Sequence, residues 1–304
     1  MASPRASRRA SLRKYGRWYF LAALALAVAA IWSAVFWAEA HHGRLLLHVL
    51  DVGQGDALFI EAGNGNQVLI DGGPDASVLA RLAAIMPFWD RSLDLLILTH
   101  PHADHLDGLL AVLERYDIGM VIESGVNHTI PEYAAWHDEM TRRAIPRVVA
   151  RRGGIVRLGG GAALRILSPL RSFDGVTVRN IHEASVVMLL SFQDARALLA
   201  GDAEAPLERL LMAATAPAGN DVRADVLKVG HHGSKTSTSA AFLGAVKPRL
   251  AVISAGRKNR YGHPTAEVID RLAAAGVTVF RTDQQGTITF TSDGGQFTPL
   301  ERRW

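Results

Sequence analysis

The segment HPHADH, residues 100–105, places four potential metal ligands within six residues. His100 and His102 are two residues apart, so both imidazoles can face one side of an extended backbone, and Asp104 and His105 follow where the chain bends into a helix. A single histidine at the end of a strand more commonly makes structural hydrogen bonds. Four ligand types in this spacing instead favour a centre for two divalent metal ions.

Two later segments carry further ligand types. LLAGD ends in Asp202, whose carboxylate can bridge two metals or, alternatively, cap a helix that starts near Pro206. GHHGS contains His231 and His232. Adjacent residues of a strand point to opposite sides, so at most one of these histidines reaches the same metal unless the backbone turns at Gly233.

A loop after the apolar run Leu250–Ile253 is rich in residue types that bind phosphate. These residues are Arg257, Lys258, Arg260, Tyr261 and His263. The turn GQGD, residues 53–56, is rich in glycine, but it lacks the lysine and the following helix of a nucleotide-binding loop. Its spacing therefore favours a tight hairpin over a phosphate site.

Composition limits the chemistry that this chain can use. The 304 residues include no cysteine, so a metal must be held by nitrogen and oxygen ligands. The formal net charge is +4, but residues 1–17 hold six of the 33 basic residues and no acid, so the rest has 27 basic and 29 acidic residues. Bulk charge is therefore no argument for nucleic-acid binding.

The basic start leads into an uncharged apolar run, Trp18–Trp37. At about 1.5 Å per residue, this run spans a bilayer core of about 30 Å, and its basic flank predicts a cytoplasmic N-terminus. We expect a basic tail at residues 1–17, a single-pass anchor or uncleaved signal at residues 18–40, and an extracytoplasmic domain at residues 41–304. The triplet Ala38-Glu39-Ala40 leaves a cleaved signal as the alternative.

The remainder alternates short apolar runs with helical patterns, which predicts packed sheets covered by helices. Expected strands are residues 45–52, 57–61, 67–71, 93–99, 120–123, 164–167, 185–192, 195–200, 226–229, 250–254, 277–281 and 287–291. Expected helices are residues 78–85, 106–116, 131–143, 206–213, 240–245 and 265–275. Each loop with metal or anion chemistry thus follows a predicted strand.

These motifs together resemble a known family. HPHADH, LLAGD and a later histidine are similar to the metallo-β-lactamase fold hydrolases, and LDVGQGDA, LIDGG, VLKVGHHGS and NRYGHP look like the extracytoplasmic domain of ComEC-type competence proteins. The resemblance covers about residues 45–291. It implies an α+β fold, an αββα four-layer sandwich, with two Zn²⁺ or Mn²⁺ ions at one edge. It also implies hydrolysis of ester bonds, in this branch DNA phosphodiesters.

The resemblance assigns a metal-binding role to seven residues. It gives His100 and His102 to the first metal, Asp104, His105 and His231 to the second, and Asp202 to the bridge between them. The third ligand of the first metal is less constrained: His182 in IHEAS occupies the place, a solvated loop residue is the alternative, and Asn180 is the fallback.

The resemblance also assigns supporting and catalytic roles. Asp71 in LIDGG, together with Asp51, would support the ligand loop through hydrogen bonds. Asp104 and Asp202 would orient a metal-activated water for in-line attack on phosphorus, and His263 would protonate the leaving oxygen or simply pack in a turn. Substrate contacts are expected from Ser234, Lys235, Arg260 and Tyr261, although the first two could merely begin the next helix.

Three functions follow from this reading. The first is a membrane-anchored, metal-dependent nuclease or phosphodiesterase that acts on DNA, with a separate DNA-uptake channel as a partner. The second is a hydrolase of another ester, such as a lactone, a β-lactam or a phosphorylcholine ester. The third is a non-catalytic anchored module that binds DNA or a partner protein.

Overall fold

The computed structural model describes residues 4–41, 43–215 and 222–300. The chain divides into two compact units, residues 1–42 and 43–304, and each is described by itself. The first contains one long helix, α1 (Pro4–His41). Its segment Tyr15–Ser33, with a hydropathy of 1.4, is long and apolar enough to cross a membrane. The division into a tail, an anchor and an extracytoplasmic domain stays a prediction.

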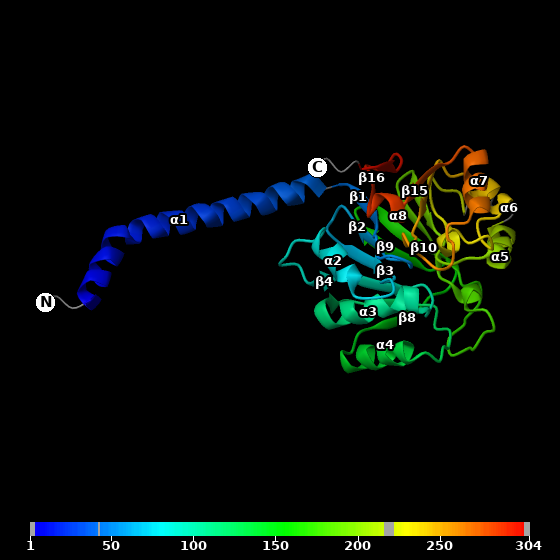
Figure 1. Cartoon of the computed structure of the whole chain (residues 1–304), viewed down its shortest axis with the longest axis horizontal. Coiled ribbons are helices and arrows are strands. Elements are labelled where there is room, and N and C mark those ends of the chain that lie inside the picture. Colours follow the sequence, from blue (N-terminus) through cyan, green and yellow to red (C-terminus); the bar gives the residue numbers. More distant parts are fainter. Residues whose placement is uncertain (1–3, 42, 216–221, 301–304) are drawn as a thin grey trace. The chain divides into compact units, whose positions relative to one another are not determined.

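Two large sheets form the second unit (Figure 1). The first has the strand order β17 (Thr298–Pro299), β16 (Ile288–Ser292), β1 (Leu45–Val49), β2 (Leu58–Glu61), β3 (Gln67–Ile70), β5 (Leu95–Leu98), β7 (Val121–Glu123) and β8 (Arg147–Val149). The second has the order β15 (Thr278–Arg281), β14 (Leu250–Ile253), β13 (Val226–Lys228), β12 (Ala195–Leu199), β11 (Val187–Phe192), β10 (Ala162–Ser168) and β9 (Ile155–Gly159). The short strands β4 (Ser92–Leu93) and β6 (Asp117–Ile118) pair separately.

Helices cover the outer face of each sheet. The first sheet packs against α2 (Ser77–Ala83), α3 (Ala103–Arg115) and α4 (Pro131–Arg142). The second packs against α5 (Ala205–Thr215), α6 (Ala240–Val246) and α7 (Ala266–Ala274). The short helices are α8 (Thr282–Gln285) and the 3₁₀ turns η1 (Ile181–Ala184) and η2 (Gly230–Gly233). These layers confirm the predicted αββα sandwich.

Side-chain alternation explains why the strands lie between two apolar layers. In β5, Leu95 and Ile97 join the core between the sheets, whereas Leu96 and Leu98 join the core beneath the helices. All four side chains are buried, as expected for a strand with both faces covered. The run LLIL therefore reads as uniformly apolar.

The parallel strands bring the ligand loops to one edge. Strand β3 runs parallel to β5 in the first sheet, and β12, β13 and β14 run parallel in the second. Loops that follow parallel strands leave from the same edge of a sheet. Asp71 follows β3, the HPHADH loop follows β5, and Asp202 follows β12, so their side chains converge.

Several short elements were not predicted, among them β6, β8, β9, β17, α8 and the two 3₁₀ turns. Strands β8 and β9 are partly exposed, with patterns that lack the continuous apolar run of the buried strands. The last strand, β17, has two exposed residues, and α8 is only four residues long. Edge strands and single-turn helices carry little hydrophobic signal, so periodicity does not detect them.

Candidate metal centre

The carboxylate of Asp202 lies at the centre of a histidine cluster. Its Oδ2 atom lies 3.4 Å from His105 Nε2 and 3.8 Å from His100 Nε2, both after β5. The same oxygen lies 3.7 Å from His232 Nε2 and 3.8 Å from His231 Nε2, both in the η2 turn. One oxygen thus faces four imidazole nitrogens from two sheets.

The first group of ligand atoms contains three histidines. His100, His102 and His182 offer nitrogens that all lie within 4.8 Å of one another. His100 Nε2 is 3.0 Å from His102 Nδ1, and His182 Nε2 is 3.3 Å from the same atom. The structure therefore places His182 in the cluster rather than in a solvated loop.

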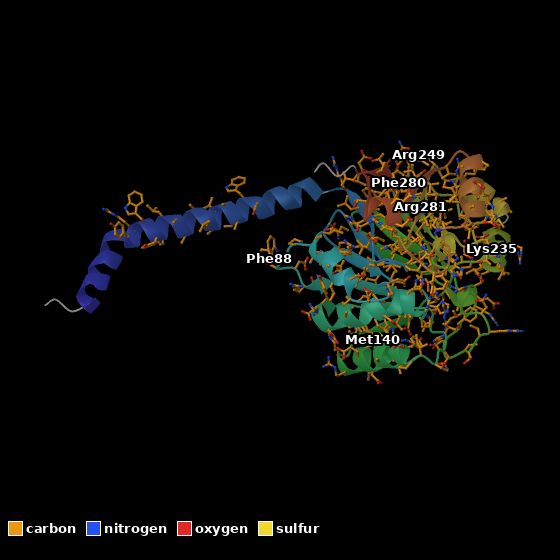
Figure 2. All side chains as sticks on the ribbon, in the orientation of Figure 1. Phe88, Met140, Lys235, Arg249, Phe280 and Arg281 are labelled. Carbon is orange, nitrogen blue, oxygen red and sulfur yellow. The ribbon has the colours of Figure 1, made fainter. Side chains whose placement is uncertain are left out.

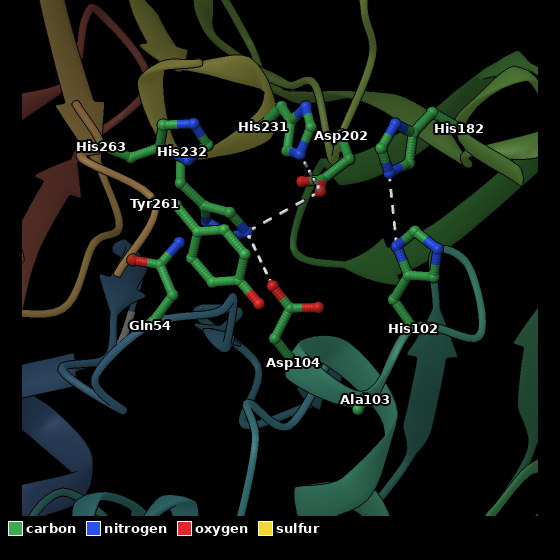
Figure 3. A pocket seen from close by; sticks show the side chains of 10 residues that line it. All are labelled: Gln54, His102, Ala103, Asp104, His182, Asp202, His231, His232, Tyr261 and His263. Carbon is green, nitrogen blue, oxygen red and sulfur yellow. Dashed lines mark hydrogen bonds and ion pairs between the residues drawn. The ribbon is translucent and has the colours of Figure 1, made fainter. Parts of the chain in front are cut away.

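The second group contains Asp104, His105 and His232, whose ligand atoms also lie within 4.8 Å of one another. His232 Nε2 is 3.3 Å from Asp104 Oδ2 (Figure 3). The sequence assigned His231 to this group, but the structure places His232 beside Asp104. The reason is local: both residues have left-handed backbones, with φ of 46° and 53°, so strand alternation does not apply to them.

Asp71 fixes the ligand loop from behind, the position that its motif predicted. Its Oδ2 atom accepts hydrogen bonds from His105 Nδ1 at 2.8 Å and from Thr99 Oγ1 at 2.7 Å, and Oδ1 accepts one from Thr99 N at 2.8 Å. The bond to Nδ1 leaves Nε2 of His105 free to bind a metal. Asp71 has a φ of 58°, a strained conformation for a non-glycine residue, which occurs here at the cluster.

Glu204 supports two histidines at once, and the sequence analysis missed it. Its Oε2 lies 3.5 Å from His182 Nδ1, and its Oε1 lies 3.4 Å from His231 Nδ1. Asn180 Nδ2 donates to Glu204 Oε2 at 2.9 Å, and Asn180 Oδ1 accepts from His182 N, so Asn180 positions other residues rather than lying among the ligands. The only sequence signal was an acid two residues after Asp202.

A buried ion pair supports His232. Asp56, in the GQGD turn, is fully buried and pairs with the buried Lys228 Nζ of β13. Asp56 Oδ1 also lies 3.3 Å from His232 Nδ1, which donates to the Ser254 carbonyl at 3.0 Å. Strands β1 and β2 pair as the predicted hairpin, but residues 50–57 connect them, so the connection is longer than the tight turn expected. This connection also supports the histidine cluster.

Glycine allows this turn to approach the ligand loop closely. Asp56 N donates to the Asp104 carbonyl at 3.1 Å. A Cβ atom on Gly55 would lie 2.1 Å from that carbonyl oxygen, and Gly55 has a φ of 142°. A side chain is excluded there on both grounds.

An open pocket of about 330 Å³ leads to the cluster. It is lined by Gln54, His102, Ala103, Asp104, His182, Asp202, His231, His232, Tyr261 and His263 (Figure 3). Tyr261 is 54% exposed, and its ring stacks on His263 with centroids 5.9 Å apart. The basic loop after β14 thus forms part of the pocket wall.

Of the four residues expected to contact substrate, only Tyr261 lines this pocket. Ser234, Lys235, Arg260 and the expected supporting residue Asp51 lie outside its lining. Ser234 is buried and bonds to Thr236 Oγ1 at 2.8 Å. Lys235 is exposed at the surface of the domain (Figure 2). Asp51 accepts a bond from Gly53 N and lies 3.5 Å from Arg81, so it contacts none of the ligand residues.

The residues fit a pair of divalent metals. Buried polar atoms with no hydrogen-bond partner include His105 Nε2, His232 Nε2 and Asp202 Oδ1, which belong to three residues of the cluster. Leaving such atoms unpaired costs about 1–3 kcal/mol each, which a bound cation would offset. The donors are imidazole nitrogens and carboxylate oxygens, a set that Zn²⁺ and Mn²⁺ both accept. His100, His102 and His182 would hold one metal, and Asp104, His105 and His232 the other, with Asp202 between them.

Without metals, the cluster attracts protons. Burial alone lowers the pKa of His105, but the carboxylates of Asp202 and Asp71 outweigh it and raise that pKa well above the usual value. For His232, burial again lowers the pKa, but Asp202 and Asp56 raise it to about 9. The same carboxylates that attract these protons would attract a divalent cation.

This fold and ligand set define a metallohydrolase class, and the sequence comparison identifies it. The signature of the metallo-beta-lactamase superfamily matches residues 50–257. The chain belongs to this superfamily. ComE operon protein 3 of Bacillus subtilis is 32% identical over 80% of the chain and 32% of its own length. Competence protein ComA of Neisseria gonorrhoeae is 31% identical over 80% of the chain and 31% of its own length.

The chain spans about a third of the length of these curated relatives. Among solved structures, CmlA, a diiron beta-hydroxylase from Streptomyces venezuelae, matches with a TM-score of 0.51 and 16% identity. That match covers 78% of this chain and 52% of CmlA. At this identity, the likeness supports the fold alone.

We predict that metal binding releases protons. Because the pKa of His105 is raised and that of His232 is about 9, both imidazoles hold protons near neutrality, and a metal must displace them. The apparent affinity for Zn²⁺ should rise as the pH is raised to about 9, by up to about tenfold per pH unit for each displaced proton. Calorimetric titration of Zn²⁺ into metal-free protein, in two buffers of different ionisation enthalpy, measures this release. Identical heats in both buffers would contradict it, and His232→Asn should release fewer protons.

We also predict that the Asp56–Lys228 pair is strongly coupled. Asp56→Asn leaves a buried ammonium without its partner, which should lower the free energy of unfolding by about 3–5 kcal/mol. Adding Lys228→Met should restore part of this loss. Denaturant unfolding of the metal-free, detergent-solubilised chain measures both. Glu139→Gln, which breaks a surface pair with Arg142, is the control and should change stability little. Additive losses in the double variant would refute the coupling.

Proposed function

We propose that this protein is a metal-dependent phosphodiesterase that cleaves DNA outside the cytoplasmic membrane. The main support is a ligand set for two metals that opens into a pocket lined by Tyr261, whose ring lies beside the Arg260 guanidinium. A phosphodiester carries negative charge, and two cations with a basic loop complement it. The Neisseria relative is named a competence protein, which agrees with a role in DNA uptake.

Within this proposal, the chain's own residues orient the reaction. Bound divalent metals supply Lewis acidity and lower the pKa of water toward neutrality. Asp104 and Asp202 border the space between the two ligand groups and would hold the attacking water by accepting its hydrogen bonds. His231, with Nδ1 facing Glu204 and Nε2 facing Asp202, would hold the Glu204 carboxylate in place by donating from Nδ1.

His263 would assist the leaving group. It lines the pocket, and its Nδ1 is buried without a partner. Burial and the nearby His232 lower its pKa, so His263 is neutral near pH 7. We therefore assign it a neutral N–H hydrogen bond to the leaving oxygen rather than transfer of a proton.

The rim favours a single strand as the substrate. Tyr261 is half-exposed, and the Arg260 guanidinium lies 5.2 Å from its ring centroid and bonds to its hydroxyl at 3.1 Å. An exposed aromatic ring beside a cation can stack an unpaired base while the cation meets the backbone. A base inside a duplex is already stacked and does not present its face to this ring.

The apolar helix and its basic flank support the proposed location. Tyr15–Ser33 can span a membrane, and the positive residues before it favour a cytoplasmic N-terminus. The catalytic unit, residues 43–304, would then lie outside the cytoplasm. We propose a separate channel protein as the partner that receives the processed strand.

The nuclease proposal predicts metal-dependent cleavage of DNA. The metal-stripped 304-residue chain, restored with Mn²⁺ or Zn²⁺, should cleave end-labelled single-stranded DNA, and gel analysis gives the rate. His102→Ala and Asp104→Ala should each lower the rate by about 10²- to 10³-fold, because each removes a ligand. His137→Ala, a histidine paired with Glu123 away from the pocket, is the matched control and should stay active.

Counting bound metals separates the possible failures of this test. His232→Ala should bind one metal fewer than the parent chain, because His232 lies in the group with Asp104 and His105. His231 lies with His182 and Asp202 but is in neither proposed ligand set, so His231→Ala should keep both metals. If two metals bind but DNA and model phosphodiesters remain intact, the nuclease proposal is wrong. Profiling lactone, β-lactam and phosphorylcholine esters would then identify the hydrolase reaction. If the wild-type protein binds DNA but hydrolyses none of these esters, an anchored binding module would instead be supported.

The stacking proposal predicts a specific loss. Tyr261→Ala should raise KM for single-stranded DNA by about 5- to 150-fold, the equivalent of about 1–3 kcal/mol per stacked base. Tyr261→Phe keeps the ring and should change KM little, and Lys235→Ala, outside the pocket, should also be neutral. Steady-state kinetics on labelled oligonucleotides measure this. Equal losses for Phe and Ala at position 261 would show that the hydroxyl, not stacking, matters.

A further inference from the structure

Two aromatic side chains project from the loop between α2 and β4. Phe88 is 81% exposed and Trp89 is 60% exposed, and their rings meet edge to face with centroids 4.8 Å apart. Figure 2 shows Phe88 extending from the domain surface. No other large apolar side chain described in residues 43–300 is as exposed as Phe88. Adjacent exposed aromatic rings usually mark a contact surface.

The loop that carries them is fixed by its neighbours. Asp90 N donates to the Pro87 carbonyl at 2.9 Å, and Asp90 Oδ1 accepts from Ser92 N and Oγ. Asp90 Oδ2 accepts from Gln67 Nε2 at 2.9 Å. The rings are therefore presented by an ordered turn that is tied to the first residue of β3.

This turn lies at the end of the domain where the chain arrives from α1. Gly43 N donates to the Gly63 carbonyl at 3.3 Å, in the hairpin turn between β2 and β3. In that hairpin, Glu61 is the register partner of Gln67, which holds Asp90. The β2–β3 hairpin and the Gln67–Asp90 hydrogen bond thus connect Gly43 to the loop that carries the aromatic pair. Gly43 begins this unit, and α1 ends two residues earlier in the chain, at His41.

We propose that Phe88 and Trp89 insert into the headgroup region of the membrane that holds α1. Aromatic side chains favour this region because it accommodates an apolar ring and a polar edge together. Arg44 and Arg91 are exposed at the same end of the domain and can face lipid phosphates, with Arg91 beside the Tyr116 ring at 5.9 Å. This inference rests on the predicted anchor and not on the nuclease proposal.

Insertion of the two rings would also determine which way the metal cluster faces relative to the bilayer. Gln67 begins β3 at the end that holds the aromatic loop, and Asp71 follows the other end of the same strand. Four residues of strand separate these ends by about 13 Å. The metal cluster would face away from the bilayer, toward a substrate that arrives from outside.

The absence of cysteine makes the test direct. A single nitroxide label is placed in the full chain through Phe88→Cys, and the control is Leu210→Cys, a 54% exposed apolar residue on α5. Both proteins are reconstituted into vesicles of phosphatidylcholine and phosphatidylglycerol. Spin relaxation by oxygen and by a water-soluble nickel chelate then reports depth. The oxygen-to-nickel ratio should be several-fold higher at position 88 than at position 210.

Equal ratios at the two positions would overturn the proposal. A high ratio at position 88 together with a short distance between labels on two chains would also overturn it, because a second copy would then cover the rings. Adding Trp89→Ser to the labelled Phe88→Cys protein should lower the ratio, because the remaining aromatic ring of the pair is then lost as well. Cleavage of a small soluble phosphodiester should not change in any of these variants, which separates this test from that of the nuclease proposal.

Discussion

The convergence of two sheets on one carboxylate is the constraint that the rest of the domain serves. Asp202 follows β12 of the second sheet, yet its nearest imidazole belongs to His105, which follows β5 of the first. A metal-ligand bond of about 2 Å tolerates little displacement, so the sheets must pack with a defined offset. The core between them, built from alternate residues of both sheets, fixes that offset. Packing in this protein therefore sets metal geometry as well as stability.

Carboxylates behind the cluster determine which nitrogen of an imidazole carries the proton and which faces the metal site. Asp71 accepts from His105 Nδ1, Glu204 lies behind His182 and His231, and Asp56 lies behind His232. A carboxylate on Nδ1 directs the lone pair of Nε2 toward the metal and makes the ligand more basic. Asp56 can stay ionised in the interior because the ammonium of Lys228 lowers its pKa against the opposing effect of burial. The acidic and basic residues of these loops thus form one electrostatic unit.

The sequence predicted much of the fold because buried strands such as Leu95–Leu98 are uniformly apolar and end in polar loops. HPHADH was readable because its ligands are neighbours in the chain. The sequence did not show which of His231 and His232 would lie beside Asp104, because this depends on the left-handed backbone of both residues, which no spacing rule predicts. The pairing of Asp56 with Lys228 joins residues 172 positions apart, and Glu204 acts through histidines of two different loops. Such long-range partners leave no local pattern.

Strand order has a consequence for how the protein is made. β1, the first strand of the domain, pairs with β16, close to the end of the chain. Leu45 lies opposite Ser292 in that ladder. During synthesis, one edge of β1 therefore stays unpaired until almost the whole domain has emerged. Open strand edges promote association with other chains. Completion of the first sheet is thus tied to the synthesis of β16, and a chain truncated before β16 would expose the edge of a central strand.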